Sequence, residues 1–161
     1  MVYFAEYDSP VGQLLLESDG GHLTGLRMGC QRNWDSVPGE DVPVLRQARE
    51  WLDAYFRGEE LQISFPLAPR GTAFQKQVWQ ILLTVPFAQT RSYGSIAREM
   101  AGMMGVEKMS AQAVGGAVGR NPIWIIIPCH RVVGSRGQLT GYAGGLDRKR
   151  WLLEHEKQKV Q

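Results

Sequence analysis

The stretch Gly119-Arg-Asn-Pro-Ile-Trp-Ile-Ile-Ile-Pro-Cys-His-Arg-Val-Val-Gly134 places one thiol directly after a short apolar run. Residues 125–127 form an apolar run that is short enough to be a buried strand. Pro128, which fixes φ and has no N–H, should end that strand. The pattern therefore predicts that Cys129 lies at the exit of a strand, followed by His130 and Arg131.

The chemistry of Cys129 depends on its protonation. A thiol is a strong nucleophile as the thiolate, and a nearby base or cation is needed to lower its pKa from about 8.5. His130 and Arg131 are the adjacent candidates. The alternative is an inert buried cysteine, because a free cysteine behaves as a small hydrophobe and neighbours on a strand point to opposite faces. The three residues alone leave both interpretations open.

Composition sets broad limits on the protein. The chain has 161 residues, 43% of them hydrophobic and 21% charged, which is typical of one soluble domain or two small ones. A net charge of +2 permits nucleic-acid binding without demonstrating it. No apolar stretch approaches the roughly 18 residues that a membrane span requires, and residues 1–10 do not form a signal peptide. We therefore expect a cytoplasmic protein.

The cysteine count argues against disulfides and metal sites. Cys30 and Cys129 do not make a disulfide framework, and a reducing compartment would keep both as thiols. His22 and Cys30 are too few ligands for a zinc site. We expect no metal, and we assign Cys30 no role.

The first part of the chain predicts a small antiparallel sheet with one helix. Residues 2–7, 13–18 and 22–28 read as strands joined by turns, and residues 43–57 have the apolar period of a helix that stops at Gly58. Residues 63–65 are a candidate further strand, and residues 66–69 a linker.

The remainder predicts a mostly helical domain. Thr72 and Gln75 form a capping-box pattern before a helix that ends ahead of Pro86. Ser95 is the expected cap of a helix through residue 100, and Ser110 of another to about residue 119, which makes a helix-turn-helix. Asp147 should begin the last helix. The predicted fold class is α+β.

Residues 111–119 have almost no side-chain bulk, because glycine and alanine fill most positions. Each glycine inside a helix costs about 1 kcal/mol relative to alanine, so a close neighbour is expected in return. That neighbour is either another helix or a ligand.

These motifs together resemble a known family. Pro-Cys-His-Arg-Val at 128–132, preceded by Asn121-Pro122 and followed by Gly141-Tyr-Ala-Gly-Gly145, is similar to the active-site signature of the O6-alkylguanine-DNA alkyltransferases. Residues 70–75, 78–79, 91–94, 113–117 and 151–153 resemble that family in the same order, and residues 9–12 and 55–58 do so more loosely. The resemblance implies a ribonuclease-H-like domain over 1–69 and a DNA-binding, alkyl-transfer domain over 70–161.

The resemblance also implies a reaction. The protein would flip O6-alkylguanine, with O4-alkylthymine as a second candidate, out of duplex DNA and transfer the alkyl group irreversibly to Cys129. It would be a single-turnover methylated-DNA–[protein]-cysteine S-methyltransferase that needs no cofactor. His130 would take the thiol proton through a water, Glu156 would orient His130, and Asn121 would tie the preceding helix to the active-site turn.

Further roles follow from the same resemblance. Tyr93, Val132 through its carbonyl, Tyr142 and the amide of Ala143 would hold the flipped base, and Trp124 would either line the pocket or narrow it. The residues facing the minor groove of double-stranded DNA would be Ser92, Ala111, Gln112, Ala113, Gly115 and Arg120. Gln112 stands where the family has an arginine wedge, so it brings no charge to base flipping. For Arg131 the sequence leaves two roles open, a structural ion pair and a functional role.

Three other functions would make different demands on the sequence. A hydrolase with a Cys129, His130 and Glu156 triad would turn over repeatedly. Alkyltransferase-like proteins, which recognise damaged DNA without repairing it, lack the cysteine. A methylation-sensing regulator would need an additional DNA-binding segment. We expect a monomer that does not associate with a membrane and has no obligate protein partner.

Overall fold

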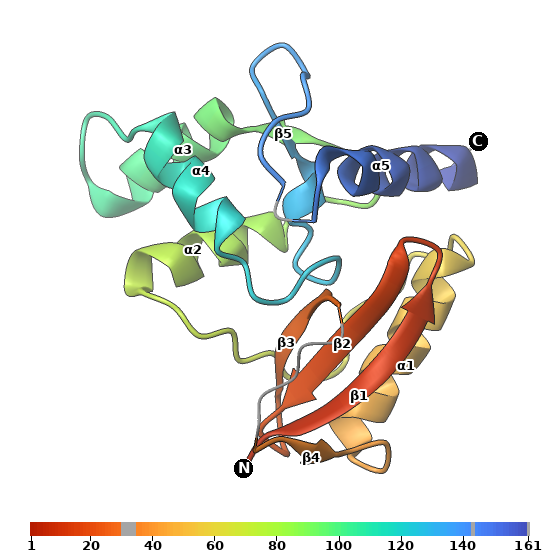
Figure 1. The fold of residues 1–161 in the computed structure, drawn as a ribbon. Coiled ribbons are helices and arrows are strands. Elements are labelled where there is room, and N and C mark those ends of the chain that lie inside the picture. Colours follow the sequence, from red (N-terminus) through yellow and green to blue (C-terminus); the bar gives the residue numbers. More distant parts are fainter. Residues whose placement is uncertain (30–34, 143, 161) are drawn as a thin grey trace. The chain divides into compact units, whose positions relative to one another are not determined.

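The computed structural model describes residues 1–29, 35–142 and 144–160, and the chain divides into two compact units. The first contains Met1–Arg70 together with Pro122–Trp124, and the second contains Gly71–Asn121 and Ile125–Gln161. Figure 1 shows the order of their elements. Cys30 and Ala143 lie outside the described residues.

The first unit is built on a sheet with strand order β3-β2-β1-β4. The antiparallel strands β1 (Tyr3–Ser9), β2 (Gly12–Ser18) and β3 (Leu23–Met28) confirm the predicted meander. The short strand β4 (Val37–Pro38) adds to β1 in parallel, so the sheet is mixed and not purely antiparallel. Pro38 is tolerated because β4 lies at the edge, where one side of the backbone needs no partner strand.

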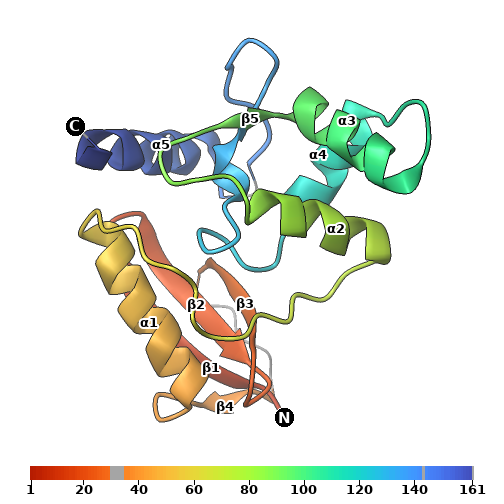
Figure 2. The same cartoon turned by 180° about the vertical axis from the view of Figure 1, so that it is seen from behind.

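The helix α1 (Pro43–Phe56) covers one face of this sheet (Figures 1 and 2). Its buried residues recur with helical spacing, and Pro at the first turn suits a position whose N–H has no helical partner. They are Val44, Leu45, Ala48, Trp51, Leu52, Ala54 and Tyr55. The helix ends at Phe56, and Gly58, two residues later, has a φ of 88°. The predicted helix is confirmed.

The prediction of a strand over residues 63–65 is wrong. In the described segment between α1 and α2, Leu67 forms an isolated parallel bridge to Leu23 of the sheet. Leu23 donates its N–H to the Pro66 carbonyl at 2.9 Å and accepts one from Ala68 at 2.9 Å. Three apolar residues specify burial but no backbone pairing, and the pairing occurs where Leu23 offers free backbone groups.

The second unit holds three helices ahead of the active-site turn. α2 (Ala73–Leu82) begins with the predicted capping box, in which Thr72 and Gln75 satisfy each other's backbone N–H. α3 spans Tyr93–Met104 and α4 spans Ala111–Gly119, the latter capped by Ser110 as predicted. Helix α4 packs on α2 and α3 through Val114, Ala117 and Val118.

The start of α3 differs from the prediction. Ser92, and not Ser95, is the N-cap, because its hydroxyl accepts the Ser95 N–H at 3.0 Å. The Ser95 hydroxyl instead donates to the Ser92 carbonyl and accepts from Arg91. Tyr93 and Gly94 are weak helix formers, which is why the sequence favoured a later start. Arg91–Ser92 is strand β5, paired in parallel with β6 (Val132–Val133).

The apolar run before Cys129 is a turn and not a strand. Residues 125–127 are buried, but Ile125 has a φ of 69°, a left-handed conformation that no extended strand contains. Cys129–Arg131 then form a single 3-10 turn, η1, which leads into β6. Hydrophobicity predicted burial correctly, but a short apolar run does not determine its own backbone geometry.

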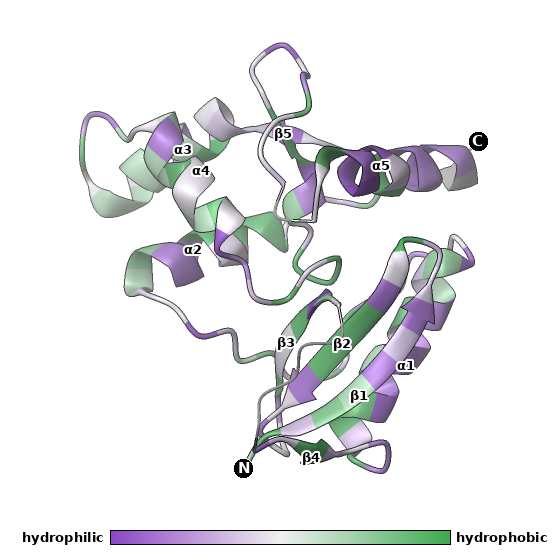
Figure 3. Cartoon of the chain, viewed as in Figure 1, coloured by the Kyte–Doolittle hydropathy of each residue, from purple (hydrophilic) through white to green (hydrophobic). Residues whose placement is uncertain are grey.

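The last helix, α5 (Leu146–Val160), is largely hydrophilic along its length, in contrast to β2 (Figure 3). It lies against η1 through a narrow buried face. Among the described residues, no helix is both long and apolar enough to cross a membrane.

Candidate active site

The turn that carries Cys129 is held by backbone bonds. Cys129 N–H donates to the Ile127 carbonyl at 2.8 Å, and Arg131 N–H donates to the Pro128 carbonyl at 3.0 Å. The Asn121 side chain also donates to Ile127, at 2.8 Å. Because Asn121 lies two residues after the end of α4, this bond joins that end of the helix to the turn with the thiol.

The thiol is enclosed, and its pKa is raised and not lowered. Only 4% of Cys129 is exposed. Burial raises the pKa of Cys129 to about 11, although hydrogen bonds with Asn121 and Tyr142 and the positive charge of Lys149 act in the opposite direction. Loss of solvation outweighs these contacts, so the resting thiol is protonated at neutral pH. A proton acceptor is then needed during any reaction.

His130, which follows Cys129 in the chain, forms a buried dyad with Glu156. Both side chains are fully buried, and His130 Nε2 lies 2.6 Å from Glu156 Oε2. Burial would raise the pKa of Glu156, but the charges and hydrogen bonds of His130 and Arg131 outweigh it and hold the pKa well below its usual range. The carboxylate is therefore ionised and can only accept, so the imidazole hydrogen must lie on Nε2. The other nitrogen, Nδ1, is then the basic one.

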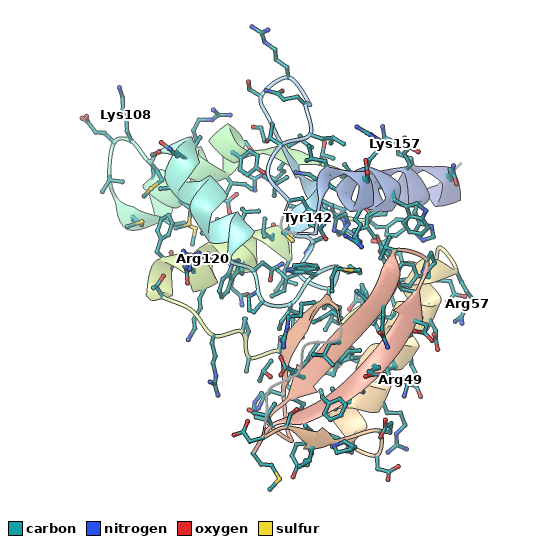
Figure 4. The ribbon with its side chains drawn as sticks, viewed as in Figure 1. Arg49, Arg57, Lys108, Arg120, Tyr142 and Lys157 are labelled. Carbon is teal, nitrogen blue, oxygen red and sulfur yellow. The ribbon has the colours of Figure 1, made fainter. Side chains whose placement is uncertain are left out.

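Two tyrosines and a lysine complete the surroundings of the thiol. The Tyr93 hydroxyl donates to the Thr140 carbonyl at 3.1 Å, and the Lys149 ammonium donates to the same oxygen at 2.8 Å. Lys149 also lies 5.8 Å from the centre of the Tyr93 ring. Figure 4 shows Tyr142 between α4 and the start of α5 in that view, and burial raises its pKa well above the ordinary value.

Sequence reasoning missed Lys149. Its side chain is fully buried, and burial lowers its pKa. The available signal was helical spacing, because Lys149, Leu152 and Glu156 recur at intervals of three and four and so share one face of α5. Among the basic residues 148–150, this one faces the interior.

The predicted DNA-facing residues lie mostly on one exposed surface of α4. Ala111, Gln112, Ala113 and Arg120 are exposed, and Gly115 is half-buried beside the Tyr93 ring. Gly116, which was not among the predicted residues, is exposed as well. Apart from adjacent residues and the backbone of α4 itself, no described residue has a heavy atom within 4 Å of a Cβ built at Gly116 or Gly119. Tight packing against another helix is therefore not the reason for these two glycines. Arg120 lies at the end of α4, and Lys108 extends from the loop before it (Figure 4).

The remaining predicted residues are placed separately. Ser92 caps α3, and Val132 pairs with Arg91 in the β5–β6 ladder, within the same unit as Cys129. Trp124 belongs to the first unit, where its N–H donates to the Leu26 carbonyl at 2.9 Å, so its pocket role stays a prediction. Among the described residues, no group of three His, Cys, Asp or Glu side chains is arranged to hold a metal.

The raised pKa of Cys129 predicts a loss of stability at alkaline pH. Between about pH 9 and pH 11 the unfolded thiol loses its proton while the folded one keeps it, so unfolding becomes easier as pH rises. The free energy of unfolding should fall by about 2 kcal/mol more in the wild type than in Cys129→Ser. Urea unfolding of both proteins at pH 8 and pH 10.5 measures this difference, and equal losses would contradict the buried thiol.

Comparisons with known proteins cover both units. Residues 2–69 match the family described as 6-O-methylguanine DNA methyltransferase, ribonuclease-like domain. Residues 73–158 match 6-O-methylguanine DNA methyltransferase, DNA binding domain.

Individual relatives agree with this. Over 162 residues, the chain is 48% identical to the methylated-DNA–protein-cysteine methyltransferase of Mycobacterium leprae, covering 99% of this chain and 95% of the relative. The protein of the same name from Methanosarcina acetivorans is 42% identical over 158 residues, covering 96% of this chain and 98% of the relative.

Among solved structures, Mycobacterium tuberculosis OGT in complex with DNA is 47% identical with a TM-score of 0.84, covering 98% of this chain and 94% of that one. On the strength of both matched regions and these relatives, the chain belongs to the 6-O-methylguanine DNA methyltransferase family.

Proposed function

We propose that this protein repairs double-stranded DNA by moving the alkyl group of O6-alkylguanine onto its own Cys129, once per molecule. The observation that carries the proposal is the enclosed thiol next to a His130–Glu156 dyad, in the unit that also presents the exposed low-bulk surface of α4. The names of the relatives and the DNA complex of OGT support the same substrate.

The dyad explains how a protonated thiol reacts. Glu156 holds the imidazole hydrogen on Nε2, which leaves Nδ1 to take the Cys129 proton through a water. The sulfur attacks the alkyl carbon, the S–C bond forms as the C–O bond breaks, and guanine leaves with the electron pair. The proton taken up at Nδ1 passes through water to the departing guanine, so His130 ends neutral. The positive Lys149 and the Asn121 and Tyr142 hydrogen bonds favour the thiolate as it develops. A thioether has no route back to the thiol here, so each molecule acts once.

Access to the lesion requires base flipping, which costs a few kcal/mol. Exposed Ala111, Ala113 and Gly116 allow the backbone of α4 to approach the walls of the minor groove closely. Gln112, exposed in the first turn of α4, would fill the vacated stack without adding a charge. Tyr93, Tyr142, the Val132 carbonyl and the Ala143 amide would contact the everted base.

A thiol hydrolase is the competing function, and stoichiometry separates the two. After incubation with an excess of duplex carrying one O6-methylguanine, intact-protein mass spectrometry should show one added methyl group per protein, and peptide mapping should place it on Cys129. The oligonucleotide should lose the same amount. Repeated loss of methyl from DNA by an unmodified protein would refute the single-turnover transfer, and unmethylated duplex is the control.

A further inference from the structure

Arg131, the residue after His130, uses all three nitrogens of its guanidinium group as hydrogen-bond donors. It is buried, with 8% exposed. Its Nε donates to Glu156 Oε1 at 2.9 Å, and its Nη2 donates to Glu156 Oε2 at 3.1 Å. The third nitrogen, Nη1, donates to the Val85 carbonyl at 2.8 Å. The guanidinium therefore binds both carboxylate oxygens and a separate backbone segment at once.

The segment after Val85 supports the same carboxylate. Ala88 N–H donates to Glu156 Oε1 at 3.1 Å. Ala88 has a φ of 67°, a left-handed conformation that is unfavourable for alanine. The Phe87 ring lies with its centre 5.7 Å from the Arg131 guanidinium carbon. Both contacts come from a turn far from α5 in sequence, and strained backbone of this kind persists only where the surroundings fix it.

These bonds leave Glu156 one orientation. Oε1 accepts from Arg131 and Ala88, and Oε2 accepts from Arg131 and His130. Rotating the carboxylate would break several bonds in a buried site, where unpaired charges are costly. The direction of the His130 ring is set by this carboxylate and therefore depends on Arg131.

We propose that Arg131 is a positioning residue that acts through Glu156 to keep the His130 hydrogen on Nε2 and to aim Nδ1 as the base, and that it does not activate Cys129 directly. This inference rests on the proposed alkyl transfer for its kinetic consequences. Its structural consequence, the state of the His130 ring, does not require that reaction.

The charges around His130 give the expected direction of change. Burial lowers the pKa of His130, Glu156 opposes this, and Arg131 and Lys149 lower the pKa further. Replacing Arg131 with methionine removes a positive charge near His130. It also removes the cation that partly neutralises Glu156, so the negative charge of Glu156 acts more strongly on His130. The pKa of His130 should rise, and the ring should no longer be held in a single tautomer.

The experiment compares wild type with Arg131→Met, Arg131→Lys and Phe87→Leu. Nitrogen NMR of ¹⁵N-histidine-labelled protein reports the tautomer and pKa of His130, single-turnover methyl transfer reports the rate constant, and titration with methylated duplex reports binding. Phe87→Leu is the matched control, because it alters packing on Arg131 and leaves every hydrogen bond to Glu156 in place.

We expect Arg131→Met to lower the transfer rate constant by about 100-fold, the lower end of what a general base contributes, with DNA affinity unchanged. The His130 pKa should rise and the ring signals should show mixed tautomers. Arg131→Lys keeps the charge without the planar fork, so its rate and tautomer mixture should be intermediate. Phe87→Leu should keep the wild-type tautomer and rate.

A purely structural role would give a different result. If the variants lost only thermal stability, while folded protein kept the wild-type rate, tautomer and pKa, the inference would be wrong. If Arg131→Met does not fold, the rate constant, tautomer and pKa measured for Arg131→Lys test the inference in its place. If the wild type itself transferred no methyl group, the proposed function would fail, and the NMR comparison would still decide whether Arg131 positions His130.

Discussion

Replacing Cys129 with serine should abolish alkyl transfer while leaving the binding of methylated DNA intact. A serine hydroxyl can accept the hydrogen bonds that Asn121 and Tyr142 make with the thiol, so the turn should keep its shape. The hydroxyl is a far weaker nucleophile, because it is harder to deprotonate than a thiol. Enclosure makes this difference larger, since burial already raises the pKa of the thiol to about 11.

The measurement uses an excess of duplex with one O6-methylguanine. Cys129→Ser should gain no methyl group by mass spectrometry, and its dissociation constant for the duplex should equal that of the wild type. Cys30→Ser changes the other cysteine of the sequence and should transfer as the wild type does. Methylated Cys129→Ser protein would show that another residue is the acceptor, and the mechanism above would have to be abandoned.

The substitution Gly116→Ala should stabilise the free protein and weaken its binding to DNA. Apart from adjacent residues and the backbone of α4 itself, no described residue lies within 4 Å of a Cβ added at Gly116, so the methyl group meets no neighbouring element. Alanine in a helix interior is favoured over glycine by about 1 kcal/mol. If α4 enters the minor groove, the same methyl group meets the groove wall, and overpacking of that kind costs about 1–3 kcal/mol.

Gly102→Ala is the matched control for this prediction. Gly102 is exposed in α3 and also has open space around its added Cβ. Both variants should raise the melting temperature by a similar amount. Only Gly116→Ala should raise the dissociation constant for duplex DNA, by about tenfold or more. Equal DNA affinities for the two variants would place α4 away from the DNA.

Local features of this chain were readable from its sequence because their causes are local. The capping box of Thr72 and Gln75 and the Ser110 cap need partners only two or three residues away. The amphipathic period of α1 and the strand–turn pattern before it are also properties of short windows. The resemblance of the 128–132 motif to a known family indicated the thiol and its neighbours before any geometry was known.

The sequence by itself therefore determined the α+β class, the hairpin strands, most helices and the segment that carries Cys129. Only the tertiary structure decided how that segment is shaped and charged. Ile125 turns where a strand was predicted, and burial raises the pKa of Cys129, which the sequence had left open. The positions of Arg131, Ala88 and Lys149 depend on contacts with residues distant in the chain. Ala88 and Glu156, for example, are 68 positions apart. Burial of a side chain and long-range hydrogen bonds depend on which segments of the chain pack together in the folded protein. No short window of sequence contains that information.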